Sequence, residues 1–290
     1  MAEVLVKDGS WTFDGRTLRI VPARERSVHK LRQALGELAV PLEAIAGISY
    51  EPARKGGRLR LRLREGADPF TQAAGGRIPD AADPYRLSID ASRTGAAQYF
   101  TDEVRNALVI EQVPGGPSDR YLMQGPGVPL TASGGDGTAT FDGETIRLEW
   151  NWMADEEKRS LGARQIALRD LLGVEWTPSA SLENGNVRFR VRGAVSKVEP
   201  KHDPNCLQLW GFDKEVRTVS ILLAAIVARL PHPAEPQVVE EAPPPPPGEP
   251  EPGESDVLLR RLRELGELHR DGVLTEEEFA QAKQSLLRRL

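Results

Sequence analysis

The chain contains a single cysteine, Cys206, among its 290 residues. One thiol forms no disulfide within the chain and supplies no thiolate set for zinc, and a free thiol is typical of a reducing compartment. Long apolar runs are also missing, since the longest, Val219 to Val227, includes Ser220 and is far shorter than the roughly 20 residues that cross a bilayer. The N-terminus lacks the basic and apolar segments of a secretory signal. We therefore expect a cytoplasmic protein.

An excess of positive charge is missing as well. Lysine and arginine number 38 against 43 aspartate and glutamate, a net charge of −5. Nucleic-acid-binding proteins usually present a strongly basic surface, so we expect no nucleic-acid partner. The hydrophobic share of 39% and the charged share of 28% are typical of globular proteins, and the length accommodates two ordinary domains plus an appendage.

Motifs of catalysis and metal binding are absent. The histidines are scattered along the chain without ligand spacing, at His29, His202, His232 and His269. No Gly-x-Ser-x-Gly elbow and no Gly-Lys-Ser/Thr phosphate loop occurs. The sequence therefore predicts a non-enzyme with no catalytic residue, no cofactor and no metal. A hydrolase or transferase with an unrecognised site stays open as a further class.

An internal repeat organises the first 232 residues. The segment Phe-Asp-Gly-Arg-Thr-Leu-Arg at 13–19 recurs 128 residues later as Phe-Asp-Gly-Glu-Thr-Ile-Arg. Further segments match in the same order: 41–52 with 167–178, 59–64 with 187–192, and Asp83-Pro84 with Asp203-Pro204. Self-similarity at nearly constant spacing indicates a duplicated domain. We expect a first repeat at 1–113, a connecting loop at 114–131 and a second repeat at 132–232, with an extra loop around Gly75-Gly76 in the first copy.

Each repeat is expected to consist of strands followed by one helix. Leucines at 59, 61 and 63 alternate with arginines, the period of a half-buried strand, and Asp-Gly pairs at 14–15 and 142–143 predict tight hairpins. Strands of the first copy are expected at 10–13, 17–21, 28–33, 37–42, 46–52, 57–64 and 85–90. Apolar residues at helical spacing then follow: Phe100, Val104, Ala107 and Leu108 in the first copy, and Val219, Leu223, Ile226 and Leu230 in the second.

This order predicts a mainly β fold of two tandem pleckstrin-homology-like (PH-like) barrels. A C-terminal helix closes one end of each barrel, because an apolar interior would otherwise face water. A small helical hairpin at the end of the chain completes the predicted architecture.

A proline- and glutamate-rich linker is expected at 233–255. It includes the unbroken run Pro243 to Pro247. Such a composition forms no packed core, and at about 3.1 Å per residue the segment extends up to roughly 70 Å. The proline run is open to a second interpretation, as a ligand for a polyproline-reading domain.

The last segment, 256–290, is predicted to form a helical hairpin that self-associates. Asp271-Gly272 marks the turn, and Thr275 with Glu278 forms a capping box. The apolar stripes consist of Leu258, Leu262, Leu265, Leu268, Phe279, Ala282, Leu286 and Leu290. Chains below about 40 residues seldom fold alone, so we expect these residues to form a homo-oligomer, with docking on the body of the chain as the alternative.

Two parts of the chain resemble known families. The string Leu274-Thr275-Glu276-Glu277-Glu278-Phe279, with Gly272 and Lys283, resembles the SHOCT short C-terminal domain of bacterial proteins. The paired Phe-Asp-Gly segments, with Trp150-Asn151-Trp152 and Leu209-Trp210-Gly211-Phe212, resemble a mainly actinobacterial family of unknown function that occurs as this same tandem. The resemblance implies a duplicated PH-like body and an oligomerising tail, and it carries no reaction or catalytic residue.

Basic stripes on two predicted strands form a possible ligand face. Its members are Arg58, Arg60, Arg62, Arg188, Arg190 and Arg192. Anionic lipid is one ligand for such stripes, but the overall acidity of the chain opposes it. The sequence therefore favours a non-catalytic scaffold whose modules bind a protein partner of unknown identity while the tail raises avidity. A peripheral-membrane protein that binds anionic lipid is the alternative.

Overall fold

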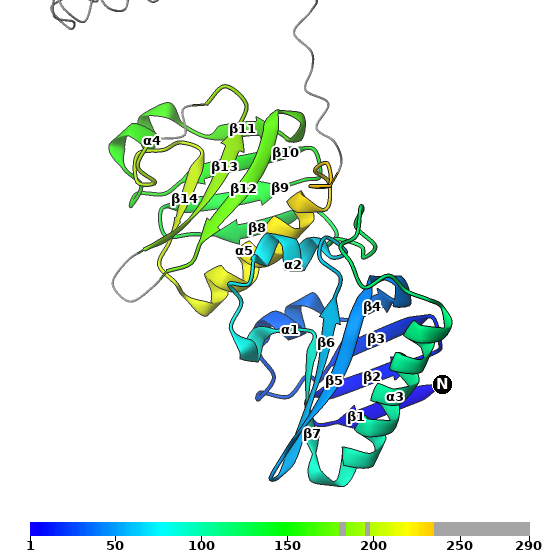
Figure 1. Ribbon diagram of the computed structural model, residues 1–290. Coiled ribbons are helices and arrows are strands. Elements are labelled where there is room, and N and C mark those ends of the chain that lie inside the picture. The colour runs from blue at the N-terminus through cyan, green and yellow to red at the C-terminus, as the bar shows by residue number, and fades with distance from the viewer. Residues whose placement is uncertain (180–183, 195–197, 235–290) are drawn as a thin grey trace, which may run out of the picture. The chain divides into compact units, whose positions relative to one another are not determined.

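The computed structural model describes residues 1–179, 184–194 and 198–234 (Figure 1). The chain divides into two units, Met1–Pro236 and Gln237–Leu290. The predicted linker beyond Ala234 and the predicted helical hairpin therefore lie outside the described residues. Among the helices of the described part, none has the length and apolar character to cross a bilayer.

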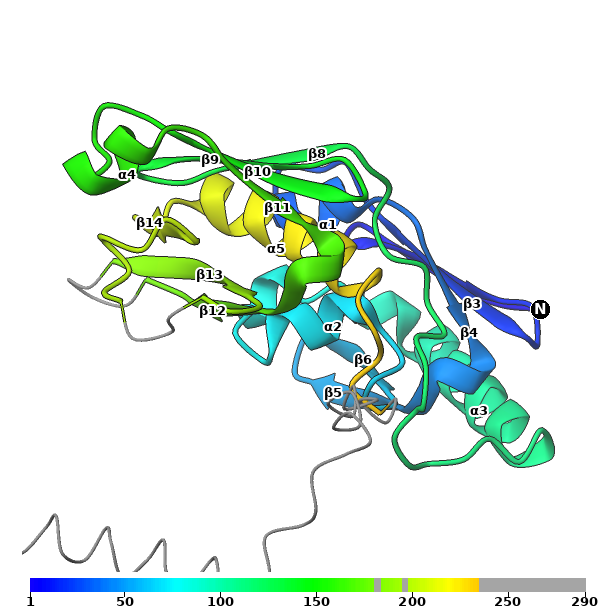
Figure 2. The ribbon, with the colours of Figure 1, turned by 90° about the horizontal axis from the view of Figure 1, so that it is seen from above.

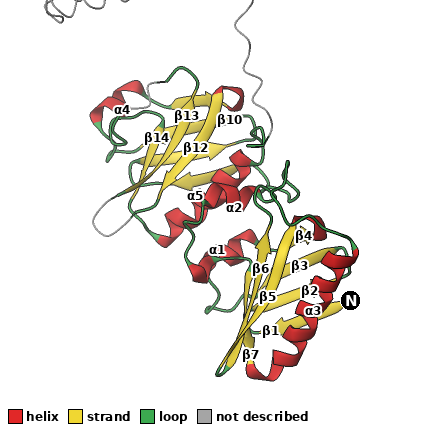
Figure 3. Ribbon diagram, viewed as in Figure 1, coloured by secondary structure: helices red, strands yellow, loops and turns green. Residues whose placement is uncertain are grey.

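The first repeat consists of two antiparallel sheets and a C-terminal helix (Figures 1 and 3). The four-stranded sheet contains β1 (Ala2–Val6), β2 (Gly9–Phe13), β3 (Thr17–Pro22) and β4 (Leu38–Pro41). The three-stranded sheet contains β5 (Ile45–Ala53), β6 (Gly56–Leu63) and β7 (Arg86–Asp90). The helices are α1 (Lys30–Leu35), α2 (Pro69–Ala74) and α3 (Thr94–Ile110), with short 3₁₀ turns η1 (Leu42–Ala44), η2 (Asp80–Ala82) and η3 (Ala91–Arg93).

The second repeat has the same order of strands, with α4 at the place of α1 and α5 at the place of α3. Its four-stranded sheet contains β8 (Leu130–Ser133), β9 (Gly137–Phe141), β10 (Thr145–Trp150) and β11 (Arg164–Ala167). Its three-stranded sheet contains β12 (Leu171–Thr177), β13 (Gly185–Val191) and β14 (Cys206–Leu209). Its helices are α4 (Glu156–Leu161) and α5 (Asp213–Val227), and its 3₁₀ turn is η4 (Leu168–Asp170). The duplication inferred from the sequence is thus a duplication of structure.

The two Asp-Gly hairpins form as predicted. The Asp14 carboxylate accepts hydrogen bonds from the backbone N–H groups of Arg16 and Thr17, at 2.9 and 2.8 Å, and Asp142 makes the same pair of bonds in the second repeat. Gly15 has a φ of +100°, a conformation that glycine adopts without steric cost. The backbone donors hold the pKa of both carboxyls below the usual value because they stabilise the ionised form.

The helix α3 packs on the inner side of its own repeat. It contacts β1 and all three strands of the β5–β6–β7 sheet, and the ring centroids of Trp11 and Phe100 lie 6.3 Å apart. Both rings are fully buried. Burial of such a large apolar side chain contributes about 1.5–3 kcal/mol, so this pair anchors the helix to the sheet.

The helix α5 packs on both repeats. It contacts β8 and β12 of its own repeat and also α2 and α1 of the first, and α2 and α5 lie side by side in both views (Figures 1 and 2). The buried residues of α2 are Pro69, Phe70, Ala73 and Ala74. The small residues Ala224 and Ala225 of α5 are fully buried, and such residues allow close packing of helices. The two repeats therefore share one hydrophobic core.

Five expectations about the fold need correction. The sheets are open and separate, so the predicted closed barrels are wrong: 3₁₀ turns carry the chain between the sheets, and helices cover the apolar faces. The strand predicted at 28–33 is instead the helix α1, which begins where His29 Nδ1 accepts a bond from the Leu31 N–H. The β1 strand was not predicted. The extra loop of the first copy contains α2, capped by Asp68, and α5 ends before Leu230.

Candidate functional site

The arginines of the predicted ligand face do not form one continuous free stripe. In the first repeat Arg58 Nη1 and Arg60 Nη2 lie 3.6 and 3.1 Å from the Asp80 carboxylate. In the second, Arg188 Nη1 lies 3.1 Å from Asp203 Oδ2. Arg190 Nε lies 3.5 Å from Glu175 Oε1, while Arg62 and Arg192 are exposed. The ligand face stays a prediction, and neighbouring carboxylates compensate most of its positive charge. The predicted oligomerisation residues, Leu258 to Leu290, lie outside the described residues.

A buried acid–base pair occupies the same position in each repeat. Asp8 and Asp136 precede the second strand of each repeat and pair with Arg32 of α1 and Lys158 of α4. Each carboxylate also accepts a backbone N–H from the last strand region, Ser88 at 2.9 Å and Gln208 at 2.8 Å. Each pair therefore ties a turn, a short helix and the seventh strand together.

The pair in the second repeat has a complete set of hydrogen bonds. Lys158 Nζ donates to Asp136 Oδ2 at 2.7 Å, to Pro200 O at 2.9 Å and to Cys206 O at 2.8 Å. The same atom lies 4.8 Å from the centroid of the Trp150 ring. A lysine ammonium has three N–H donors, and all three are used here.

The pair in the first repeat is incomplete. Arg32 Nη1 donates to both oxygens of Asp8, at 2.9 and 3.0 Å. The side chain is only 7% exposed, and its Nε and Nη2 find no hydrogen-bond partner within the described part of the chain. A buried donor without a partner costs about 1–3 kcal/mol, so the first repeat carries an unfavourable feature that the second lacks.

A cavity of about 380 Å³ lies beside this incomplete pair. Arg32, Arg86 and Ser88 line it, together with Asp8 and residues 26–30. Residues 80–81 and Asp213, at the start of α5, complete its wall. The cavity is therefore formed by both repeats.

One aspartate of the cavity wall is surrounded by arginines. Asp80 Oδ2 lies 2.7 Å from Arg86 Nη1, and Arg58 and Arg60 also contact this carboxylate. Three guanidinium groups thus face one carboxylate. The cavity lining itself contains four cationic side chains, Arg26, Lys30, Arg32 and Arg86, and three carboxylates, Asp8, Asp80 and Asp213. The arginine stripe predicted from the sequence lies outside this lining.

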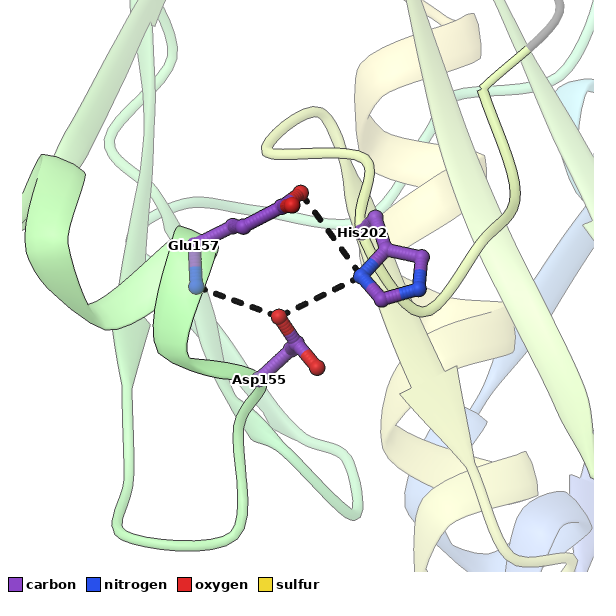
Figure 4. Close-up of side chains that lie close together, drawn as sticks. All are labelled: Asp155, Glu157 and His202. Atoms are coloured by element: carbon purple, nitrogen blue, oxygen red, sulfur yellow. Dashed lines mark hydrogen bonds and ion pairs between the residues drawn. The ribbon is translucent and has the colours of Figure 1, made fainter.

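The equivalent position of the second repeat carries an acidic cluster with a histidine (Figure 4). His202 Nδ1 lies 3.2 Å from Asp155 Oδ1 and 3.6 Å from Glu157 Oε2. These three residues offer ligand atoms within 4.8 Å of one another, and His and carboxylates are zinc ligands. However, Lys201 Nζ lies 3.6 Å from Asp155 Oδ2 and supplies positive charge, so ion pairs account for the cluster. Sequence spacing did not reveal it because only the fold brings His202 to α4.

Two buried groups that resemble reactive ones are held in their neutral forms. Burial raises the pKa of the Cys206 thiol to about 12, and an un-ionised thiol is a poor nucleophile. Burial and the neighbouring Asp68 raise the pKa of Tyr85 well above its usual value, while its hydroxyl donates to Asp68 Oδ2 at 2.7 Å. Both groups therefore serve packing and the cap of α2.

Three aromatic residues of the second repeat are exposed, Trp152, Trp210 and Phe212, and we call them the aromatic surface. These side chains are 81%, 39% and 61% exposed. The rings of Trp210 and Phe212 lie 6.2 Å apart in an edge-on arrangement. Gly135 connects the two motifs, because it lies against the Trp210 ring and accepts a bond from the side chain of Asn151, the neighbour of Trp152. The sequence displayed both aromatic motifs but did not reveal this connection.

Comparison with known proteins identifies two family matches. The model of a family described as "Domain of unknown function (DUF4429)" matches residues 11–105 and again residues 139–228. The model of the short C-terminal domain, SHOCT, matches residues 260–287. A search of curated proteins found no match. The two regions of the first match coincide with the two structural repeats.

Proposed function

Because the chain belongs to the DUF4429 family in two copies and ends in a SHOCT domain, we propose that it is a non-catalytic cytoplasmic scaffold. In this proposal the tandem PH-like repeats bind a protein partner and the SHOCT tail mediates oligomerisation. The order of four strands, three strands and a helix in both repeats supports the PH-like assignment.

The aromatic surface is the observation that carries the proposal of a protein partner. Aromatic residues are enriched in protein interfaces, and tryptophan is prominent among the residues that dominate binding energy. Trp152 and Phe212 expose most of their side chains, whereas the other tryptophan of the same motif, Trp150, is packed against the core. An apolar segment of another protein is the occupant that such a surface suits.

Substitution of the aromatic surface tests partner binding. Full-length chain carrying Trp152→Ser and Phe212→Ser is compared with wild type in capture from native lysate, followed by mass spectrometry. The control is Leu172→Ser, which changes an exposed leucine elsewhere in the second repeat. We expect a partner that wild type and the control capture and that the double variant loses, since hot-spot truncations cost about 2 kcal/mol or more. Equal capture by all three chains would remove the aromatic surface from the proposal.

The SHOCT tail supports the proposal of oligomerisation. Linking weak modules through an oligomer raises avidity by about 10²–10⁴ when the linkers span the sites. The test is the mass of the full chain and of a 1–236 truncation in light scattering. The truncation point keeps His232, which is buried and whose Nε2 lies 2.9 Å from Gly66 O. We expect an oligomer for the full chain and a monomer for the truncation; equal monomeric masses would contradict the proposal.

Binding of anionic lipid has less support. On β6, both Arg58 and Arg60 face Asp80. On β13, Arg188 faces Asp203. Compensated charge attracts a negative surface weakly. Liposome sedimentation of the Arg62→Glu variant checks this. Arg62 is the better position because it is exposed, whereas Arg188→Glu would also break a buried ion pair.

A further inference from the structure

Arg32 and Lys158 occupy equivalent positions, yet only Lys158 has partners for all its donors. Lys158 uses three acceptors of its own repeat. Arg32 has five N–H donors; Nη1 bonds to Asp8, while Nε and Nη2 are buried and unbonded among the described residues. Lys158 is thus saturated within its own repeat, whereas two nitrogens of Arg32 have no acceptor among the described residues. We propose that the cavity beside Arg32 binds the phosphate group of a small, soluble phosphomonoester.

The charges around the cavity favour an oxyanion. Arg26, Lys30 and Arg86 line it together with Arg32. Of the carboxylates, Asp8 is bonded to Arg32, and Asp80 faces several guanidinium groups, the closest being that of Arg86. A guanidinium group presents parallel N–H donors that match phosphate oxygens, and such charge-assisted bonds are about twice as strong as neutral ones.

The size and the carboxylates of the cavity limit the rest of the ligand. Its volume of about 380 Å³ lies near the lower end of ligand pockets, which span about 300–1,000 Å³. Asp80 and Asp213 belong to its lining, and carboxylates accept hydrogen bonds from hydroxyl or ammonium groups. A cavity of this volume holds one small molecule. The occupant is therefore a small phosphomonoester that carries hydroxyl or amino groups, such as a sugar phosphate, and not a lipid bilayer.

The site belongs to the first repeat alone. At the matching place in the second repeat, Lys158 is saturated, and Asp155 and Glu157 add negative charge around His202. An anion would meet the carboxylates of Asp155 and Glu157 there, and Lys158 has no donor left for it. This binding goes beyond the proposed scaffold function and does not depend on the aromatic surface or on the tail.

Calorimetric titration of the full-length chain at constant ionic strength tests the site. The titrants are inorganic phosphate, glucose 6-phosphate and, as a carboxylate control, acetate. We expect saturable binding of one phosphate per chain, tighter binding of the ester and no saturable binding of acetate. Arg32→Lys gives the first repeat the residue of the second, and it should weaken binding at least about tenfold, because each lost bond to a charged group is worth roughly that factor. Arg190→Lys, an equal exchange on β13 outside the cavity lining, should change binding less than about twofold.

Several results would overturn the assignment. It would be overturned if phosphate showed no saturable binding, or if acetate bound as tightly as phosphate. It would also be overturned if glucose 6-phosphate bound no more tightly than inorganic phosphate, or if Arg32→Lys kept the wild-type affinity. A thermal melt of Arg32→Lys checks its fold, and Arg26→Ala, at an exposed position of the wall, provides a second variant that should also weaken phosphate binding. Co-sedimentation of the wild-type chain with phosphatidylserine vesicles, lost in Arg32→Lys, would show that the site binds a membrane surface. That result would contradict a soluble ligand.

Discussion

At the scale of single residues, the buried pair of the second repeat should be the most sensitive point for stability. Lys158 and Asp136 are both buried, and removing one partner of such a pair leaves an uncompensated charge. We predict that Lys158→Met lowers the free energy of unfolding by about 3–5 kcal/mol in urea titration. Lys201→Met, at an exposed ion pair, should cost less than about 1 kcal/mol. A double variant with Asp136→Asn should recover part of the loss, and a fully additive loss would contradict this account.

The buried thiol should give the chain a particular alkaline behaviour. The pKa of Cys206 is raised to about 12 from a usual value of 9.0, so above pH 9 the unfolded chain loses a proton that the folded chain keeps. Stability from this group is therefore fully present below pH 9 and is lost as the pH rises toward 12. We predict a smaller decline of stability between pH 8 and pH 10 in Cys206→Ala than in wild type. Rapid reaction of the native thiol with Ellman's reagent at pH 8 would show that the thiol is accessible and contradict the prediction.

At the scale of elements, α2 connects the repeats although it belongs to the first alone. Phe70 is buried in α2, and truncation of a buried phenylalanine costs about 3–5 kcal/mol. We predict that Phe70→Ala accelerates hydrogen exchange in α5 of the second repeat, because α2 covers that helix. The matched control is Phe100→Ala in α3, which packs within its own repeat and should affect α5 less. Equal acceleration of α5 by both variants would exclude a specific role for α2.

The sequence predicted the elements whose signals are local. Alternating leucines on β6, the Asp-Gly hairpins and the apolar faces of α3 and α5 all followed from periods of two or 3.6 residues. The short helix α1 was mistaken for a strand because six residues show too little periodicity. Asp68 and Pro69 are a good helix start, but the surrounding Gly-rich segment suggested a loop. The cavity was beyond prediction because its wall combines residues as distant as Asp8 and Asp213.

At the scale of the whole molecule, the two repeats should unfold together. Both contribute to one hydrophobic core cluster, and His232 near the end of the second repeat bonds to Gly66 of the first. We predict a single calorimetric transition for residues 1–236, with a van't Hoff enthalpy equal to the calorimetric enthalpy. Two resolved transitions would mean that the repeats are energetically independent.

The placement of α2 has a consequence for synthesis on the ribosome. Its apolar side emerges roughly 140 residues before its partner α5, which at about 5–20 residues per second leaves it uncovered for roughly 7–30 seconds. During that interval the nascent chain exposes Phe70 and its neighbours to other molecules. The apolar side of α2 in the first repeat therefore stays exposed until the second repeat is synthesised. A nascent chain whose synthesis stops between the two repeats would be a substrate for chaperones and proteases.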